Sequence, residues 1–214
     1  PVNTDLVPNY ADVFSNLKMQ PWNSVNGVAY GIPHGRGANL LAYRTDIVKP
    51  APTSWGAVFD TNSPYKGKIT AYDSPIYIAD AALYLMKTKP ELGIKYPYAL
   101  DQKQFDASIA LLKEQKPLIS EYWGDYLKHV ASLKSGTTVL GTTWQVNINL
   151  AKSEKVPVEG IKPVEGSTGW SDTWMVSSAA KNPNCAYMWL NHIISPKANS
   201  LVAEYFGEAP SNAK

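Results

Sequence analysis

The chain has a single cysteine, Cys185, among its 214 residues. One cysteine excludes an internal disulfide, and its surroundings carry no metal-ligand spacing. We expect the thiol to be buried as a small apolar group on a helix near the end of the sequence. The sequence therefore predicts neither a structural disulfide nor a metal site.

Long runs of one charge and long apolar runs are also missing. The 20 basic and 18 acidic residues are interspersed and leave a net charge of +2, without the basic footprint of a nucleic-acid or anionic-membrane binder. We predict no nucleic-acid partner. No segment approaches the apolar length of a membrane-spanning helix. The residues after Pro1 lack the basic and apolar regions of a signal peptide, as expected of a mature or trimmed chain.

Signatures of enzyme chemistry are scarce. The three histidines, His34, His129 and His192, are far apart in the sequence. No His-x-x-x-His, Gly-x-Ser-x-Gly or phosphate-binding Gly-Lys-Ser/Thr motif occurs. We predict that the protein is not an enzyme and uses no cofactor, and a small hydrolase is the catalytic alternative.

Aromatic residues are the surplus of the composition, with 7 tryptophans and 13 tyrosines. Asp172 lies between Trp170 and Trp174, and in an extended segment these three side chains would share one face. A carboxylate beside an indole is a receptor for an ammonium group. The same pattern also fits a sheet strand whose tryptophans belong to the core.

Strands and helices are predicted to alternate. Apolar periodicity predicts helices after Thr53, from Glu121 to about Gly136, and over residues 9–17, 77–87, 102–115, 183–194 and 196–206. Strands are expected over residues 28–33, 39–44, 69–72 and 137–143. The glycines of residues 34–37 permit a turn or a close backbone approach. This order predicts an α/β fold, in which ligands meet the carboxyl ends of strands.

Three segments carry a family resemblance. They are Tyr30-Gly31-Ile32-Pro33 through Thr53-Ser54-Trp55; Leu133-Lys134-Ser135-Gly136 into Leu140-Gly141-Thr142-Thr143-Trp144; and Glu165-Gly166 through Trp170-Ser171-Asp172 to Phe206-Gly207-Glu208-Ala209-Pro210. In this order they resemble the solute-binding proteins of bacterial ABC importers, specifically the spermidine/putrescine-binding family. The resemblance covers nearly the whole chain.

The resemblance implies a fold of the type II periplasmic-binding-protein class. Two lobes joined by crossing strands would close over a ligand held in the cleft between them. Residues 1–44 would be part of lobe 1 with the crossover strands, residues 45–165 lobe 2, and residues 166–214 the return to lobe 1. Family members have a further opening segment and continue past the position of Lys214. We therefore expect an incomplete first lobe, unless the rest of the same protein or a second chain supplies the missing segment.

The resemblance also implies ligand-binding residues. Trp170 and Asp172 match the tryptophan and aspartate that contact a ligand ammonium group, and Trp144 matches a second-lobe tryptophan that covers the alkyl stem. Asp73 matches an acidic position used in polyamine recognition, although an aspartate before Ser-Pro can instead cap a helix.

Departures from the family pattern leave the identity of the ligand undecided. Ile76 and Asn147 stand where polyamine binders carry further carboxylates, and Arg36 stands where related members often have tryptophan. If Arg36 faces the ligand, its guanidinium can bind a carboxylate bidentately, which would suit an ω-amino acid such as 4-aminobutyrate. The alternative is a solvated arginine or a partner of a nearby acid.

The resemblance implies the solute-binding component of an ABC importer. It would bind a polyamine such as putrescine or spermidine, or an ω-amino acid, and deliver it to a membrane permease. It would be located in the periplasm, or outside the membrane of a Gram-positive cell. A sugar-binding receptor is an alternative, because tryptophan and tyrosine also stack on sugar rings. A ferric-ion binder would need adjacent tyrosines, which the sequence lacks.

Overall fold

The computed structural model describes residues 1–214, which form two compact units. Unit 1 contains Pro1–Gly37 and Gly169–Lys214, and unit 2 contains Ala38–Thr168. The chain therefore passes into unit 2 once and returns once. These boundaries differ from the predicted ones at residues 44/45 and 165/166. Strand β4 (Leu40–Arg44), predicted with the first lobe, forms its hydrogen bonds within unit 2.

Unit 2 is built on a five-stranded sheet in the order β6-β5-β7-β4-β8. Strand β5 runs parallel to β6 and β7, whereas β4 runs antiparallel to β7 and β8. The other strands are β5 (Ile69–Tyr72), β6 (Ile119–Trp123), β7 (Leu140–Thr143) and β8 (Val158–Ile161). Because β5, β6 and β7 are parallel, the residues that follow them emerge at the same edge of the sheet.

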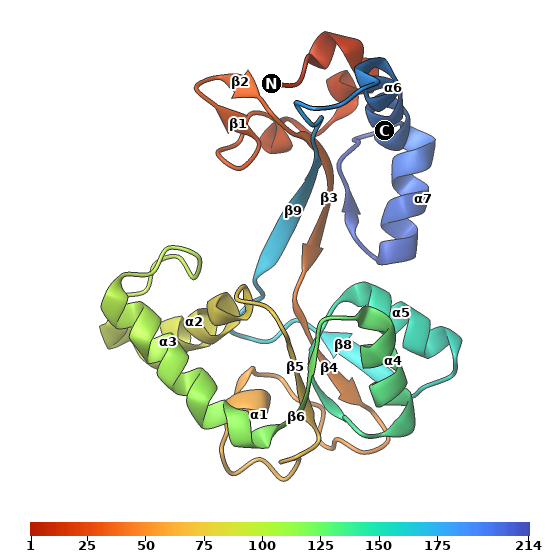
Figure 1. The fold of residues 1–214 in the computed structure, drawn as a ribbon. Helices are drawn as coiled ribbons and strands as arrows, with labels where there is room; N and C mark the ends of the chain where they lie inside the picture. The colour runs from red at the N-terminus through yellow and green to blue at the C-terminus, as the bar shows by residue number, and fades with distance from the viewer. The chain divides into compact units, whose positions relative to one another are not determined.

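Helices cover both faces of this sheet (Figure 1). Leu41 belongs to a core with α1, α2 and α3, whereas the next residue, Ala42, packs with α4 and α5. Successive residues of a strand point to opposite faces, so β4 contributes to both cores. The helices are α1 (Gly56–Phe59), α2 (Tyr77–Thr88), α3 (Gln102–Gln115), α4 (Tyr126–Ser135) and α5 (Gln145–Ser153), with the 3₁₀ turns η4 (Pro90–Leu92) and η5 (Lys116–Leu118).

Unit 1 has a three-stranded sheet in the order β10-β3-β9, and Figure 1 shows β3 and β9 side by side. Ile32 of β3 packs with Leu190 and Ile194 in the core of this unit. Its strands are β1 (Ser24–Val25), β2 (Val28–Ala29), β3 (Ile32–Ala38), β9 (Gly169–Trp174) and β10 (Ala209–Pro210); its helices are α6 (Pro183–Ile193), α7 (Pro196–Phe206) and the 3₁₀ turns η1 (Thr4–Leu6), η2 (Pro8–Asp12) and η3 (Ser15–Leu17).

Local signals set several helix ends. Asp101 and Gln104 bond reciprocally to each other's backbone N–H groups and begin α3. Gly136 ends α4 with a φ of 78°, a left-handed conformation that glycine adopts without strain. Proline stands in the first turn of α6 and of α7, where no intrahelical hydrogen bond is lost.

Three local predictions are wrong. Residues 9–17 are not an α-helix, because the extended backbone at Val13 separates two 3₁₀ turns and bridges Asn212. Glu121 lies in strand β6, paired with β5, and the following helix begins only after its cap, Asp125. Cys185 is exposed, not buried.

The structure contains neither a candidate membrane span nor a candidate metal cluster. No helix combines the length and apolar character needed to cross a bilayer. No group of three or more histidine, cysteine, aspartate or glutamate side chains is arranged to hold a metal ion.

Candidate functional site

Strand β9 carries the pair that the sequence singled out. The Trp170 indole Nε1 donates a hydrogen bond to Asp172 Oδ2 at 3.1 Å. The indole is half-buried and the carboxylate is exposed. The structure thus brings Trp170 and Asp172 together, as expected for side chains two residues apart on a strand.

The glycines of strand β3 make room for two side chains. A Cβ added at Gly37 would lie 2.0 Å from Trp170 Cζ2, and one added at Gly35 would lie 2.6 Å from Glu208 Oε2. The indole and the Glu208 carboxylate therefore lie directly against the β3 backbone. Residues 34–37 form no turn and continue the strand, so the close-approach alternative is confirmed.

Glu208 is a site residue that the sequence analysis did not predict. It follows Gly207, which ends α7 with a φ of 67°, and it precedes β10. Burial raises the pKa of Glu208, the charge of Asp172 raises it further, and a hydrogen bond from Trp170 lowers it. The available signal was the Phe206-Gly207-Glu208 segment, which belongs to the family resemblance.

The two carboxylates have no basic partner. The ion pairs of the structure involve neither Asp172 nor Glu208. The nearby His34 does not compensate, because burial lowers the pKa of its imidazole more than the charge of Asp172 raises it. Two neighbouring carboxylates without a basic partner are complemented by a cation.

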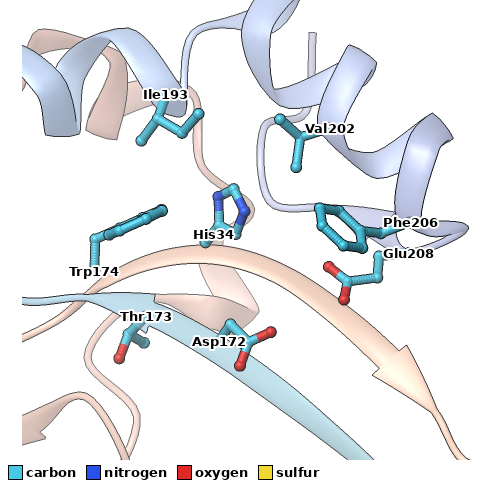
Figure 2. A pocket seen from close by; sticks show the side chains of 8 residues that line it. All are labelled: His34, Asp172, Thr173, Trp174, Ile193, Val202, Phe206 and Glu208. Carbon is cyan, nitrogen blue, oxygen red and sulfur yellow. The ribbon is translucent and has the colours of Figure 1, made fainter. Parts of the chain in front are cut away.

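A cavity of about 550 Å³ adjoins these groups in unit 1. In Figure 2 the carboxylates of Asp172 and Glu208 lie on the same side of His34, and the Phe206 ring lies beside Glu208. Trp174 packs edge-on against His34, with ring centroids 5.4 Å apart. The lining residues are His34, Asp172, Thr173, Trp174, Ile193, Val202, Phe206 and Glu208.

Arg36 contacts a different part of unit 1. Its guanidinium carbon lies 5.8 Å from the centre of the Phe14 ring, a cation–π distance. Its Nε is buried without a hydrogen-bond partner. Arg36 does not line the cavity that contains Asp172, so the structure does not bring these two predicted ligand residues together.

Trp144 lies in an aromatic cluster at one edge of the unit 2 sheet. Its ring centroid is 5.0 Å from that of Tyr72 and 4.9 Å from that of Trp123. These three residues end or follow the parallel strands β5, β6 and β7. Trp144 Nε1 also donates to Asn39 Oδ1 at 3.0 Å, which further fixes the half-buried indole.

Asp73 is exposed at the same edge of the unit 2 sheet. Its backbone N–H donates to Trp123 O at 2.8 Å. The Asp73 carboxylate adds to the effect of burial in raising the pKa of Tyr122. The helix-cap alternative is wrong, because no side chain caps α2 and the Ile76 N–H bonds to Ser74 Oγ.

His129 packs against the aromatic cluster. Its ring stacks on Trp123 with centroids 4.8 Å apart, and Nε2 lies 3.2 Å from Thr143 Oγ1. Burial lowers the pKa of His129 to about 3. The folded protein therefore keeps a neutral imidazole at pH values where the unfolded chain binds a proton.

We expect His129→Phe to reduce the acid sensitivity of the fold. Because the folded pKa lies below the unfolded value of about 6.5, His129 lowers the free energy of unfolding as pH falls from about 6.5 towards 3, by up to about 1.4 kcal/mol per pH unit. Phenylalanine keeps a ring against Trp123 and removes this loss. Urea unfolding at pH 7 and pH 4.5 measures the difference, and equal losses in variant and wild type would contradict the assignment.

The fold is that of the periplasmic binding proteins, as predicted. The TpPotD lipoprotein of Treponema pallidum has the same fold, with a TM-score of 0.82 and 15% identity over 99% of this chain and 65% of that chain. The binding protein MotA of A. tumefaciens B6, solved in complex with glucopine, has a TM-score of 0.77 and 20% identity over 99% and 61%.

The family is shown by the sequence. The whole chain, residues 1–214, matches the family described as bacterial extracellular solute-binding protein, and the chain belongs to this family. The spermidine/putrescine-binding periplasmic protein of Escherichia coli K12 is 24% identical over 212 residues, which are 99% of this chain and 57% of that protein. These relatives are binding proteins and not enzymes, in agreement with the prediction. The chain spans less than two thirds of the length of each of them.

Proposed function

We propose that this chain belongs to the solute-binding component of an ABC importer and that its ligand is a small amine. One observation carries the proposal: Asp172 and Glu208 lie beside the Trp170 indole with no basic side chain paired to either. Carboxylates and an indole face are the groups that recognise an ammonium ion.

The energetics of the cluster favour a cationic ligand. Glu208 has a raised pKa partly because the negative charge of Asp172 is nearby. An ammonium group between the two carboxylates would remove this repulsion and donate a charge-assisted hydrogen bond to each. The indole would cover the adjoining methylene groups, a contact worth on the order of 1 kcal/mol.

Unit 2 supplies the remaining proposed ligand contacts. Trp144 presents a half-buried indole and Asp73 an exposed carboxylate after neighbouring strands of one sheet edge. This arrangement repeats the combination of ring and acid found in unit 1. We therefore keep both residues as predicted ligand contacts, Trp144 for an alkyl stem and Asp73 for an ammonium group.

The family supports the proposed location and partners. The protein would act in the periplasm, or outside the membrane of a Gram-positive cell, and would pass its ligand unchanged to a membrane permease. The E. coli relative is named for spermidine and putrescine, which supports an amine as the cargo. The chain covers 57% of the E. coli relative, and a further lobe 1 segment, from the same protein or from a second chain, remains part of the proposal.

An ω-amino acid is the less supported ligand. It needs a cation for its carboxylate, and the proposed one, Arg36, lies against Phe14 and outside the cavity. A sugar would not need two adjacent carboxylates without a basic partner. The observed contacts therefore favour a diamine or polyamine over both alternatives.

Calorimetric titration tests the ligand class. We expect heat of binding with putrescine and spermidine, weaker binding of 4-aminobutyrate, and no binding of glucose. Arg36→Ala should leave putrescine binding unchanged, whereas it would abolish 4-aminobutyrate binding if Arg36 held the carboxylate. No heat with any amine would refute the proposal. Mass spectrometry of the recovered amine checks that it is returned unchanged, because a hydrolase would alter it.

A further inference from the structure

A chain of buried polar side chains runs through unit 2 to Trp144. Trp144 Nε1 donates to Asn39 Oδ1 at 3.0 Å, and Asn39 Nδ2 donates to Thr168 Oγ1 at 2.7 Å. The Thr168 hydroxyl then donates to Asp80 Oδ1. Asn39, Thr168 and Asp80 are all buried, so water does not replace these bonds.

The donors and acceptors fix the direction of this chain. An indole N–H only donates, so the Asn39 amide must turn its oxygen to Trp144 and its nitrogen to the other side. That nitrogen meets Thr168 and also bonds to the Asp80 carboxyl. The single hydroxyl proton of Thr168 goes to Asp80. Asp80 is therefore the terminal acceptor on which the orientation of the other groups depends.

These hydrogen-bonded side chains also join the two segments through which the polypeptide passes between the units. Asn39 is the second residue of unit 2 and Thr168 is its last. Their backbones are bonded as well, Asn39 N to Thr168 O at 3.0 Å. Asp80, in the first turn of α2, thus holds both crossing segments to one helix.

A carboxyl group at this position is costly for the fold. Asp80 is only 1% exposed, and no ion pair involves it. Burial raises the pKa of Asp80 to about 7, whereas the bonds from Thr168 and Asn39 lower it. An apolar side chain would fill the space without this cost. Packing alone therefore gives no reason for an acid here.

We propose that Asp80 is a positioning residue for ligand binding, which fixes the Trp144 indole through Thr168 and Asn39. The inference rests on the proposed role of Trp144 as a ligand contact. Asparagine at position 80 would replace one carboxyl oxygen by an N–H₂ donor, which cannot accept from Thr168 or Asn39, so the bonds that end the chain would be weakened. The orientation of the Asn39 amide, and with it the acceptor of the Trp144 indole, would then be fixed less firmly.

The test is a measurement on the Trp144 indole N–H, which needs no ligand. Its ¹⁵N–¹H resonance is assigned by comparison with Trp144→Phe. In Asp80→Asn we expect the resonance to shift and its exchange with solvent to accelerate by about tenfold. Asp106→Asn, which removes an exposed carboxylate of the same unit, should change neither. An unchanged Trp144 signal in Asp80→Asn would overturn the inference.

Ligand affinity provides the second readout. Asp80→Asn should weaken putrescine binding by about tenfold, while Asp106→Asn binds like wild type. If wild type binds no amine, the proposed function fails but the resonance measurement still decides the role of Asp80. If wild type binds putrescine and Asp80→Asn binds equally well, the positioning role fails alone. Should Asp80→Asn not fold, Thr168→Val, which removes only the hydroxyl donor, is judged by the same two criteria.

Discussion

Replacing Asp172 by asparagine should weaken putrescine binding roughly tenfold to a hundredfold, about 1.5–3 kcal/mol, because the ligand ammonium loses a charged acceptor. The Trp170 indole can still donate to the asparagine oxygen, so the change removes charge and preserves shape. Calorimetric titration with putrescine measures the loss. The effect should be largest at low salt, because Asp172 is exposed.

Asp5→Asn is the matched control for this prediction. It removes an exposed carboxylate from the same unit and should leave the affinity unchanged. Asp172→Asn should also lower the pKa of Glu208, because the Asp172 charge raises it in the wild type. Carboxyl titration by NMR detects this without ligand. Undiminished putrescine affinity in Asp172→Asn would remove Asp172 from the site, whatever the pKa of Glu208.

Helices with local signals were predictable from the sequence. The bounds of α3 agree with the prediction, because its capping residues and its apolar periodicity lie within the helix itself. The same holds for α7, which has proline in its first turn and glycine at its end. Such elements depend on residues a few positions apart.

Elements that depend on distant partners were not predictable. Residues 119–123 form β6 because they pair with β5, which lies far away in the sequence. The glycines of β3 fit either a turn or a close approach in the sequence, and only the fold shows that they make room for Trp170 and Glu208 from the other end of the chain. The short 3₁₀ turns after Pro8 likewise depend on the pairing of Val13 with Asn212. No local pattern contains this information.

The residues of the candidate site also differ in how far the sequence predicts them. The period of a strand places Trp170 and Asp172 on one face, and Trp144 and Asp73 lie at or after strand ends, but the family resemblance is what marks these four residues as ligand contacts. Glu208 was missed because it meets Asp172 only through the fold. The charge of Arg36 suits a ligand carboxylate, but the direction of a side chain between two glycines cannot be derived from sequence, and Arg36 contacts Phe14.

Gly37→Ala should displace the Trp170 indole and impair amine binding by at least about tenfold. The new Cβ would lie 2.0 Å from Trp170 Cζ2 and 2.5 Å from two further ring atoms, so the ring must move. Such overpacking costs about 1–3 kcal/mol, and the bond from the indole to Asp172 would be lost. Urea unfolding, putrescine titration and the Trp170 indole N–H resonance measure the three effects.

A double-mutant cycle separates this clash from a general effect of alanine on strand β3. In a Trp170→Ala background the ring is absent, and Gly37→Ala should then be neutral or slightly stabilising, because alanine restricts the unfolded chain more than glycine does. The cycle should give an interaction energy of about 1–3 kcal/mol. Equal destabilisation in both backgrounds would mean that the glycine serves the backbone of β3 and does not make room for the indole.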